Sequence, residues 1–86
     1  MILLKDAAPR LDGVLADPSP ITIRQLQCLA WVQAGKSSHD IAGIIGISHR
    51  TVEGHLAKIC LHLGVRTRFQ AVLRALELGL IGKIDP

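Results

Sequence analysis

The same local pattern occurs four times between Thr22 and Gly79: a residue that caps a helix, apolar residues at helical spacing, and then a glycine. A serine or threonine before a helix accepts a hydrogen bond from a backbone N–H of the first turn. A glycine after the helix can adopt the left-handed conformation that ends it. The capping residues and closing glycines are, in order, Thr22 and Gly35, Ser37 and Gly46, Ser48 and Gly64, and Thr67 and Gly79.

Within these segments the apolar residues recur every three or four positions, as they do on one face of a helix. In three segments a polar residue stands three positions after the cap, at the spacing of a capping box. These three residues are Gln25, Asp40 and Gln70. No alternating strand pattern competes with the helical one. The sequence therefore predicts an all-α, four-helix bundle-like domain.

Residues 1–20 differ in composition from the rest of the chain. They contain Pro9, Gly13, Pro18 and Pro20 among charged and small residues, which is typical of a tether and not of a packed core. The 86 residues of the chain suffice for one small domain. We expect a flexible N-terminal leader or linker at 1–20, a folded domain at 21–82 and a tail at 83–86.

Composition argues against several classes of protein. No apolar run is long enough to span a membrane, and Lys5 and Asp6 follow the first apolar residues too soon for a signal-peptide core. The predicted location is therefore the cytoplasm. Cys28 and Cys60 lie within apolar helical patterns, where a free thiol behaves as a small hydrophobic group.

Catalytic and metal-binding constellations are missing from the sequence. Paired carboxylates, a nucleophile with its base, and a phosphate loop are not visible, and a core of this size has no room for a sizeable pocket. The spacing of the four histidines matches no zinc signature. We therefore expect no enzymatic activity, no cofactor and no metal.

Only Gly46-Ile47-Ser48 joins the second and third predicted helices. So short a turn makes two helices cross steeply, as in a helix-turn-helix. Ala42 is small enough for the helices to approach, Gly46 can take the left-handed turn, and Val52 fills the angle between the helices. The pattern favours DNA binding, and the alternative is an ordinary corner between two helices.

A denser set of motifs extends along residues 21–82. It comprises Ile21-Thr22, Arg24, Cys28-Leu29, Gly35-Lys36-Ser37, Asp40-Ile41-Ala42, Ile47-Ser48-His49-Arg50-Thr51-Val52, His55, Leu63-Gly64-Val65-Arg66-Thr67-Arg68 and Gln70-Ala71-Val72. Together these motifs resemble the helix-turn-helix domain of the LuxR/GerE-type family. That family consists of bacterial transcription regulators, in which this domain usually follows a sensing or receiver domain. The surroundings of Trp31 are most similar to the quorum-sensing branch.

The resemblance implies a sequence-specific, DNA-binding transcription regulator that acts as a homodimer. The third helix, at about 49–63, would lie in the major groove of double-stranded DNA, and the fourth would form a two-fold dimer. Two such helices would read inverted half-sites about one DNA turn apart. The formal net charge of +3 is compatible with a polyanionic partner. RNA polymerase or a full-length regulator would be a further partner.

The resemblance also gives candidate DNA contacts. The residues expected to bind phosphate are Ser38, His39, Ser48, Arg50, Thr51, Lys58, Arg66 and Arg68. The candidate base-reading residues are Glu53, Gly54 and Ala57, at outward positions of the third helix. A carboxylate can accept a hydrogen bond from cytosine, and a methyl group can contact that of thymine. Because family members often carry lysine or another polar residue at these three positions, we expect an unusual or relaxed specificity.

The fourth predicted helix is apolar around more than one face. Val72 and Ala75 are expected to face the core, which would leave Leu73, together with Leu76 or Leu80, exposed in a monomer. A two-fold dimer interface would cover them, although they could instead contact the leader or a missing domain.

A second hypothesis makes the chain a protein-interaction module. Its fourth helix would then sequester full-length regulators, and Glu53 and Gly54 would have weakened DNA binding. Dimerisation without DNA binding would favour this hypothesis.

Overall fold

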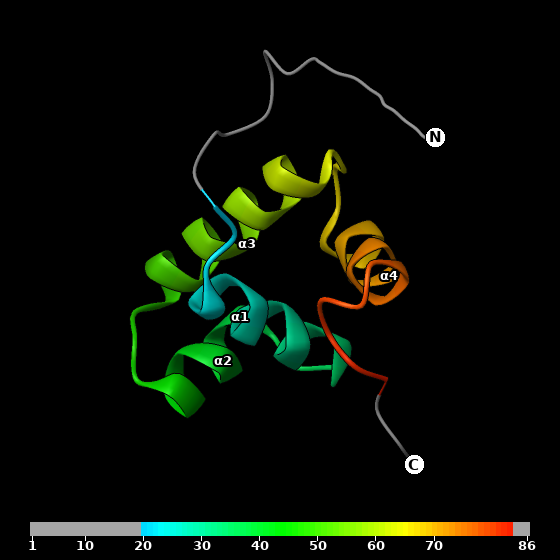
Figure 1. Ribbon diagram of the computed structural model, residues 1–86. Helices are drawn as coiled ribbons and strands as arrows, with labels where there is room; N and C mark the ends of the chain where they lie inside the picture. The colour runs from blue at the N-terminus through cyan, green and yellow to red at the C-terminus, as the bar shows by residue number, and fades with distance from the viewer. Residues whose placement is uncertain (1–19, 84–86) are drawn as a thin grey trace, which may run out of the picture.

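The computed structural model describes residues 20–83. Four helices form this part of the chain: α1 (Ile23–Gln33), α2 (Ser38–Ile45), α3 (His49–Leu63) and α4 (Arg68–Glu77) (Figure 1). The prediction of an all-α fold is confirmed. Most of the predicted leader and tail lies outside the described residues. Within 20–83, no helix combines the length and the apolar character needed to cross a membrane.

Each helix begins next to the capping residue that the sequence predicted. The four capping side chains accept a hydrogen bond from the backbone N–H three residues further on, and they belong to Thr22, Ser37, Ser48 and Thr67. The reciprocal bond of a capping box forms in α1, α2 and α4. Since one such N-cap contributes about 1 kcal/mol, these short-range bonds fix the starts of the helices.

The helix ends depend on left-handed glycines. Gly46 follows α2 with φ +72°, and Gly64 follows α3 with φ +69°, a conformation that costs a residue with a Cβ atom about 1–2 kcal/mol. Helix α1 ends at Gln33 with Ala34 as its C-cap. Gly35 follows this cap with φ +90°, so a left-handed glycine closes the helix as predicted.

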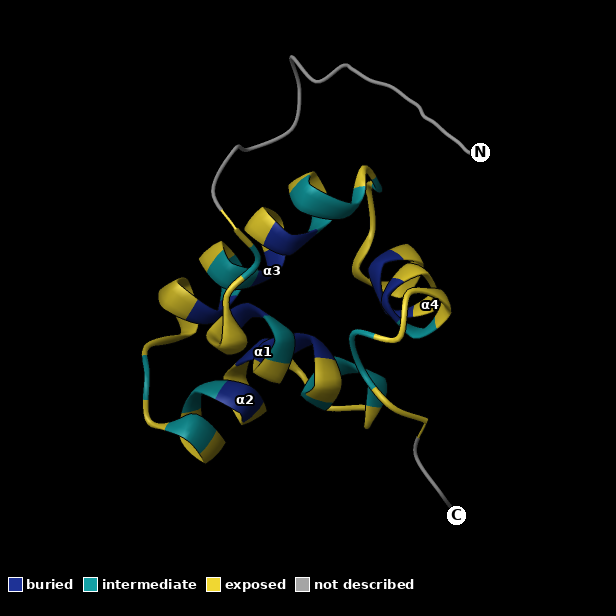
Figure 2. Cartoon of the chain, in the orientation of Figure 1, coloured by how far each residue is buried: buried dark blue, intermediate teal, exposed yellow. Residues whose placement is uncertain are grey.

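Helices α1 and α3 pack together at the centre, and each of them also packs against α2 and α4. Figure 1 shows α2 and α4 on opposite sides of this central pair, and among the described residues these two outer helices do not pack against each other. Buried residues occur on all four helices, where Figure 2 colours them dark blue, and they form one core. The core residues are Cys28, Leu29, Ile41, Val52, Leu56, Ile59, Ala71, Val72 and Ala75.

The corner between α2 and α3 has the structure that its sequence predicted. The N–H groups of Gly46 and Ile47 both donate to the carbonyl oxygen of Ala42, at 3.0 and 3.2 Å. Val52 is completely buried, and Ala42 packs against the same core. The corner is therefore a helix-turn-helix. Exposed residues at the starts of α2 and α3 contribute to the surface of the domain.

Helix α4 buries one face and exposes another. Val72 and Ala75 lie in the core as predicted, together with Ala71. Phe69 and Leu73 on the helix, and Leu78 just after it, are instead 69%, 49% and 52% exposed.

The predicted exposure of Leu76 and Leu80 is wrong, because both side chains are half-buried and pack against the core. Leu80 reaches the core because the chain turns back after α4, where its N–H donates to the carbonyl of Ala75 at 2.9 Å.

Candidate nucleic-acid interface

The first turns of α2 and α3 meet through two histidines. The imidazole rings of His39 and His49 stack with centroids 3.9 Å apart and planes 11° apart. A helix start carries unsatisfied N–H groups and the positive end of the helix dipole, which favour anions such as phosphate. The stacked rings therefore join two helix starts into one polar edge.

His49 is not among the DNA contacts that the sequence predicts. The two histidines are ten positions apart, and only the crossing of the helices brings them together. No local pattern in the sequence could have shown this pairing.

The start of α3 is exposed and polar. Ser48, Arg50 and Thr51 all face solvent. The Ser48 hydroxyl accepts from the Thr51 N–H at 3.0 Å and lies 2.8 Å from the Thr51 hydroxyl. These two side chains therefore cap the helix, and they place two exposed hydroxyl groups in its first turn, which also carries the exposed Arg50.

The outer face of α3 is unusually bare. Gly54, Ala57 and Lys58 are exposed, and a Cβ atom built on Gly54 would meet nothing within 4 Å. A ligand could therefore approach the backbone of α3 closely at this point. Gly54 and Ala57 therefore lie on the outward side of the third helix, as predicted, and Lys58 is exposed next to Ala57.

Glu53 has a different environment from its neighbours, because its side chain is hydrogen-bonded to residues at the starts of α2 and α4. Its carboxylate accepts from Arg68 Nη2 at 2.9 and 3.1 Å and from the Ser38 hydroxyl. Arg68 Nη1 in turn donates to Ser38 Oγ at 3.0 Å. We call this cluster the Ser38–Glu53–Arg68 network. The sequence treated its members as three separate DNA contacts, and the structure brings them together.

The network affects the exposure of its three side chains and the pKa of Glu53. Ser38 is only 6% exposed, while the side chains of Arg68 and Glu53 are 42% and 43% exposed. The hydrogen bond from Ser38, followed by that from Arg68, lowers the pKa of the Glu53 carboxyl below its ordinary value. Glu53 is therefore ionised at neutral pH, and its charge faces Arg68.

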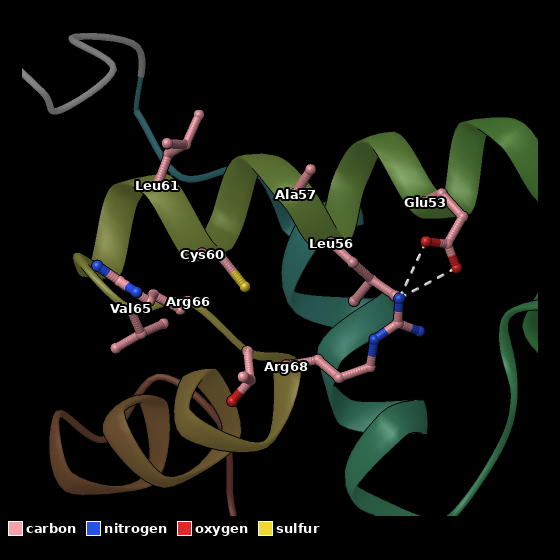
Figure 3. A pocket seen from close by; sticks show the side chains of 9 residues that line it. Glu53, Leu56, Ala57, Cys60, Leu61, Val65, Arg66 and Arg68 are labelled. Carbon is pink, nitrogen blue, oxygen red and sulfur yellow. Dashed lines mark hydrogen bonds and ion pairs between the residues drawn. The ribbon is translucent and has the colours of Figure 1, made fainter.

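A groove of about 560 Å³ lies between α3, the loop after it and the start of α4. Figure 3 shows Glu53 and Arg68 bridging this groove at one end, with Arg66 and Val65 at the other. The wall also includes Leu56, Ala57 and Cys60. Burial raises the pKa of the Cys60 thiol, so the neutral thiol forms part of the apolar wall. Arg66 is exposed on the loop, away from the ion pair.

Comparisons with known proteins agree with this geometry. The family model for bacterial regulatory proteins of the luxR family matches residues 19–75. The transcriptional activator protein VanR of Vibrio anguillarum is 43% identical over 77 residues, which cover 90% of this chain and 29% of VanR. The transcriptional activator protein LuxR of Aliivibrio fischeri is 43% identical over 61 residues, or 71% of this chain and 24% of that protein. The chain thus spans less than a third of either relative.

Two solved structures have the same fold. The transcription factor GerE matches with a TM-score of 0.67 and 34% identity, covering 71% of this chain and 91% of GerE. The response regulator ChrA of a heme-sensing two-component system matches with a TM-score of 0.71 and 31% identity, covering 76% of this chain and 32% of ChrA. The predicted resemblance is confirmed: with the matched residues extending over more than half of its length, the chain belongs to the LuxR family of bacterial regulatory proteins.

Proposed function

We propose that this chain is a transcription regulator that binds double-stranded DNA with α3 in the major groove. The observation that carries the proposal is the exposed polar edge at the starts of α2 and α3, which continues into the bare outer face of α3. In a helix-turn-helix, the second helix enters the groove and the first crosses the backbone. The names of the relatives, which are transcriptional activators, support the same function.

In this arrangement, the residues that bind phosphate differ from those that contact bases. His39, Ser48, Arg50, Thr51 and Lys58 would bind phosphates at the edge of the groove, since all five are exposed near the starts of α2 and α3 or along α3. Such contacts set register and affinity without reading sequence.

Base contacts would come from the outer face of α3. Gly54 would let the backbone approach the base edges, and the Ala57 methyl group would contact thymine. Glu53 would read a base only after leaving the Ser38–Glu53–Arg68 network. The outer face of α3 therefore offers few polar side chains that could hydrogen-bond to bases, so we expect a modest difference in affinity between operator and random DNA.

We further propose that two copies associate through α4. Phe69 and Leu73 are exposed large apolar residues one turn apart on this helix, and Leu78 follows at its end. A self-complementary, two-fold contact would cover this face. It would also place two copies of α3 on successive turns of one duplex.

The salt dependence of binding tests the proposal. The protein is titrated into a labelled random-sequence duplex by fluorescence anisotropy at several salt concentrations. Each phosphate contact contributes about 0.9 to the slope of log affinity against log salt. The Arg50→Gln/Lys58→Gln variant should bind more weakly, with a slope that is shallower by about 0.9 for each phosphate that the variant no longer neutralises.

A matched control separates direct binding from net charge. Arg74→Gln/Lys83→Gln removes the same number of positive charges at exposed positions on and after α4, and it should bind nearly as the wild type does. Equal losses of affinity in the two double variants would refute the assignment to α3. A stable dimer that binds no DNA even at low salt would instead favour the protein-interaction hypothesis.

A further inference from the structure

In the Ser38–Glu53–Arg68 network, the guanidinium of Arg68, a candidate phosphate contact, is paired with the carboxylate of Glu53 from the same chain. Arg68 begins α4, Glu53 lies in the second turn of α3, and Ser38 begins α2. Helices α2 and α4 do not pack against each other within the described residues. The hydrogen bond between Arg68 and Ser38 therefore connects two elements that are otherwise joined only through α1 and α3.

The contacts that Glu53 makes are those that a DNA phosphate would make at the same place. Like a phosphate, the carboxylate is an anion with several acceptor oxygens, and it accepts from a guanidinium and from a hydroxyl. Arginine binds carboxylate and phosphate groups in the same fork geometry. Since one guanidinium cannot serve both anions fully, Glu53 and a phosphate compete for Arg68.

The position of the ion pair makes this competition relevant to DNA. Glu53 lies one residue before Gly54 on α3, and both partners of the pair are half-exposed. Arg68 reaches Glu53 across the open groove beside α3 (Figure 3). A duplex lying along α3 would therefore pass close to the guanidinium.

We propose that Glu53 is an internal competitor that withholds Arg68 and the Ser38 hydroxyl from DNA phosphate. This proposal rests on the proposed function and deepens it. Because phosphate contacts do not depend on the base sequence, Glu53 lowers the affinity of the protein for every DNA duplex, whatever its sequence. Because this loss is the same for operator and random DNA, Glu53 sets the overall strength of DNA binding and leaves the ratio of the two affinities unchanged.

Neutralising the carboxylate tests the competition. Glu53→Gln keeps the size of the side chain and releases the arginine from its ion pair. The variant should bind a random-sequence duplex severalfold more tightly than the wild type, with a salt slope that is steeper by about 0.9 per protomer. Circular dichroism verifies that the four helices are retained, and Glu53→Ala provides a second release variant.

The chain offers a matched control for the change in charge. Glu77 on α4 also pairs with an arginine, at 3.1 Å from Arg74, so Glu77→Gln breaks a second Glu–Arg pair with the same change in net charge. It should leave the salt slope near that of the wild type. The double variant Glu53→Gln/Arg68→Gln restores the wild-type net charge and should lose the gain of the single variant.

The outcomes separate the two proposals. A gain that Glu77→Gln reproduces, or that survives in the double variant, overturns the competition at Arg68 while DNA binding stands. Weaker binding by Glu53→Gln also overturns it and makes Glu53 a direct DNA contact. DNA binding by Glu53→Gln in the absence of wild-type binding supports the proposal in its strongest form. Absence of binding by every variant overturns both the competition and the proposed function.

Discussion

Glu53 shows how one residue can belong to a functional surface and to the fold at the same time. It lies on the outer side of α3, yet its carboxylate connects the starts of α2 and α4 through Ser38 and Arg68. Because these hydrogen bonds lower the pKa of the Glu53 carboxyl below 4.5, its ionised form stabilises the folded state. This contribution is present at neutral pH and is lost as the pH falls through the lowered pKa.

A pH titration of stability checks this contribution. At pH 7 the free energy of unfolding of the wild type should exceed that of Glu53→Gln by less than about 1 kcal/mol, because half-exposed ion pairs are screened by solvent. The difference should shrink as the pH falls below the ordinary pKa of a glutamate, and it should vanish only once the pH lies below the lowered pKa of Glu53 in the folded state. Urea denaturation of both proteins between pH 3 and 7 measures it, and a difference independent of pH would exclude the carboxylate charge as its source.

The sequence could not predict these residue-scale contacts. Ser38 and Arg68 are 30 positions apart, and the position of Glu53 on α3 resembles that of a base-reading residue. The direction of its side chain depends on how α4 crosses α3, which no local pattern encodes. By contrast, the exposure of Arg50, Gly54 and Ala57 follows from helical periodicity alone and could be predicted.

At the scale of the helices, local hydrogen bonding explains why the prediction succeeded. Thr22, Ser37, Ser48 and Thr67 bond within their own first turns, so a few neighbouring residues determine each start. The apolar period then specifies the buried face. Leu76 lies four residues after the buried Val72, so the same period explains why Leu76 packs against the core. Leu80 lies beyond the helix, and its packing depends on the turn at Gly79.

Two glycines of the helix-turn-helix should respond in opposite ways to alanine. Gly46 has φ +72°, so Gly46→Ala should destabilise the domain by about 1–2 kcal/mol through backbone strain. Gly54 is helical, and its new Cβ would meet open space, so Gly54→Ala should stabilise the domain by about 1 kcal/mol. Urea denaturation followed by circular dichroism measures both changes.

The Gly54→Ala variant also tests how closely DNA approaches. If the bare backbone of α3 lies against base edges, Gly54→Ala should weaken DNA binding despite its gain in stability. Unchanged affinity would place the DNA away from the backbone at this position.

At the scale of the whole molecule, the exposed face of α4 predicts self-association. Replacing Leu73, which is 49% exposed, with aspartate should shift the chain to a monomer by placing a charge in the interface. Leu61→Asp is the matched control, because Leu61 is 53% exposed on α3 and not on α4. Analytical ultracentrifugation reports the oligomeric state, and a wild type that stays monomeric at high micromolar concentration would contradict the dimer.

We propose that α3 and the start of α2 form the surface that meets DNA. Amide NMR spectra of the chain, recorded during titration with a short duplex at moderate salt, test this proposal residue by residue. The largest chemical-shift changes should fall on His39, the first turn of α3, Gly54 and Ala57, with smaller changes on the exposed face of α4. Changes confined to α4, or none at low salt, would contradict the claim.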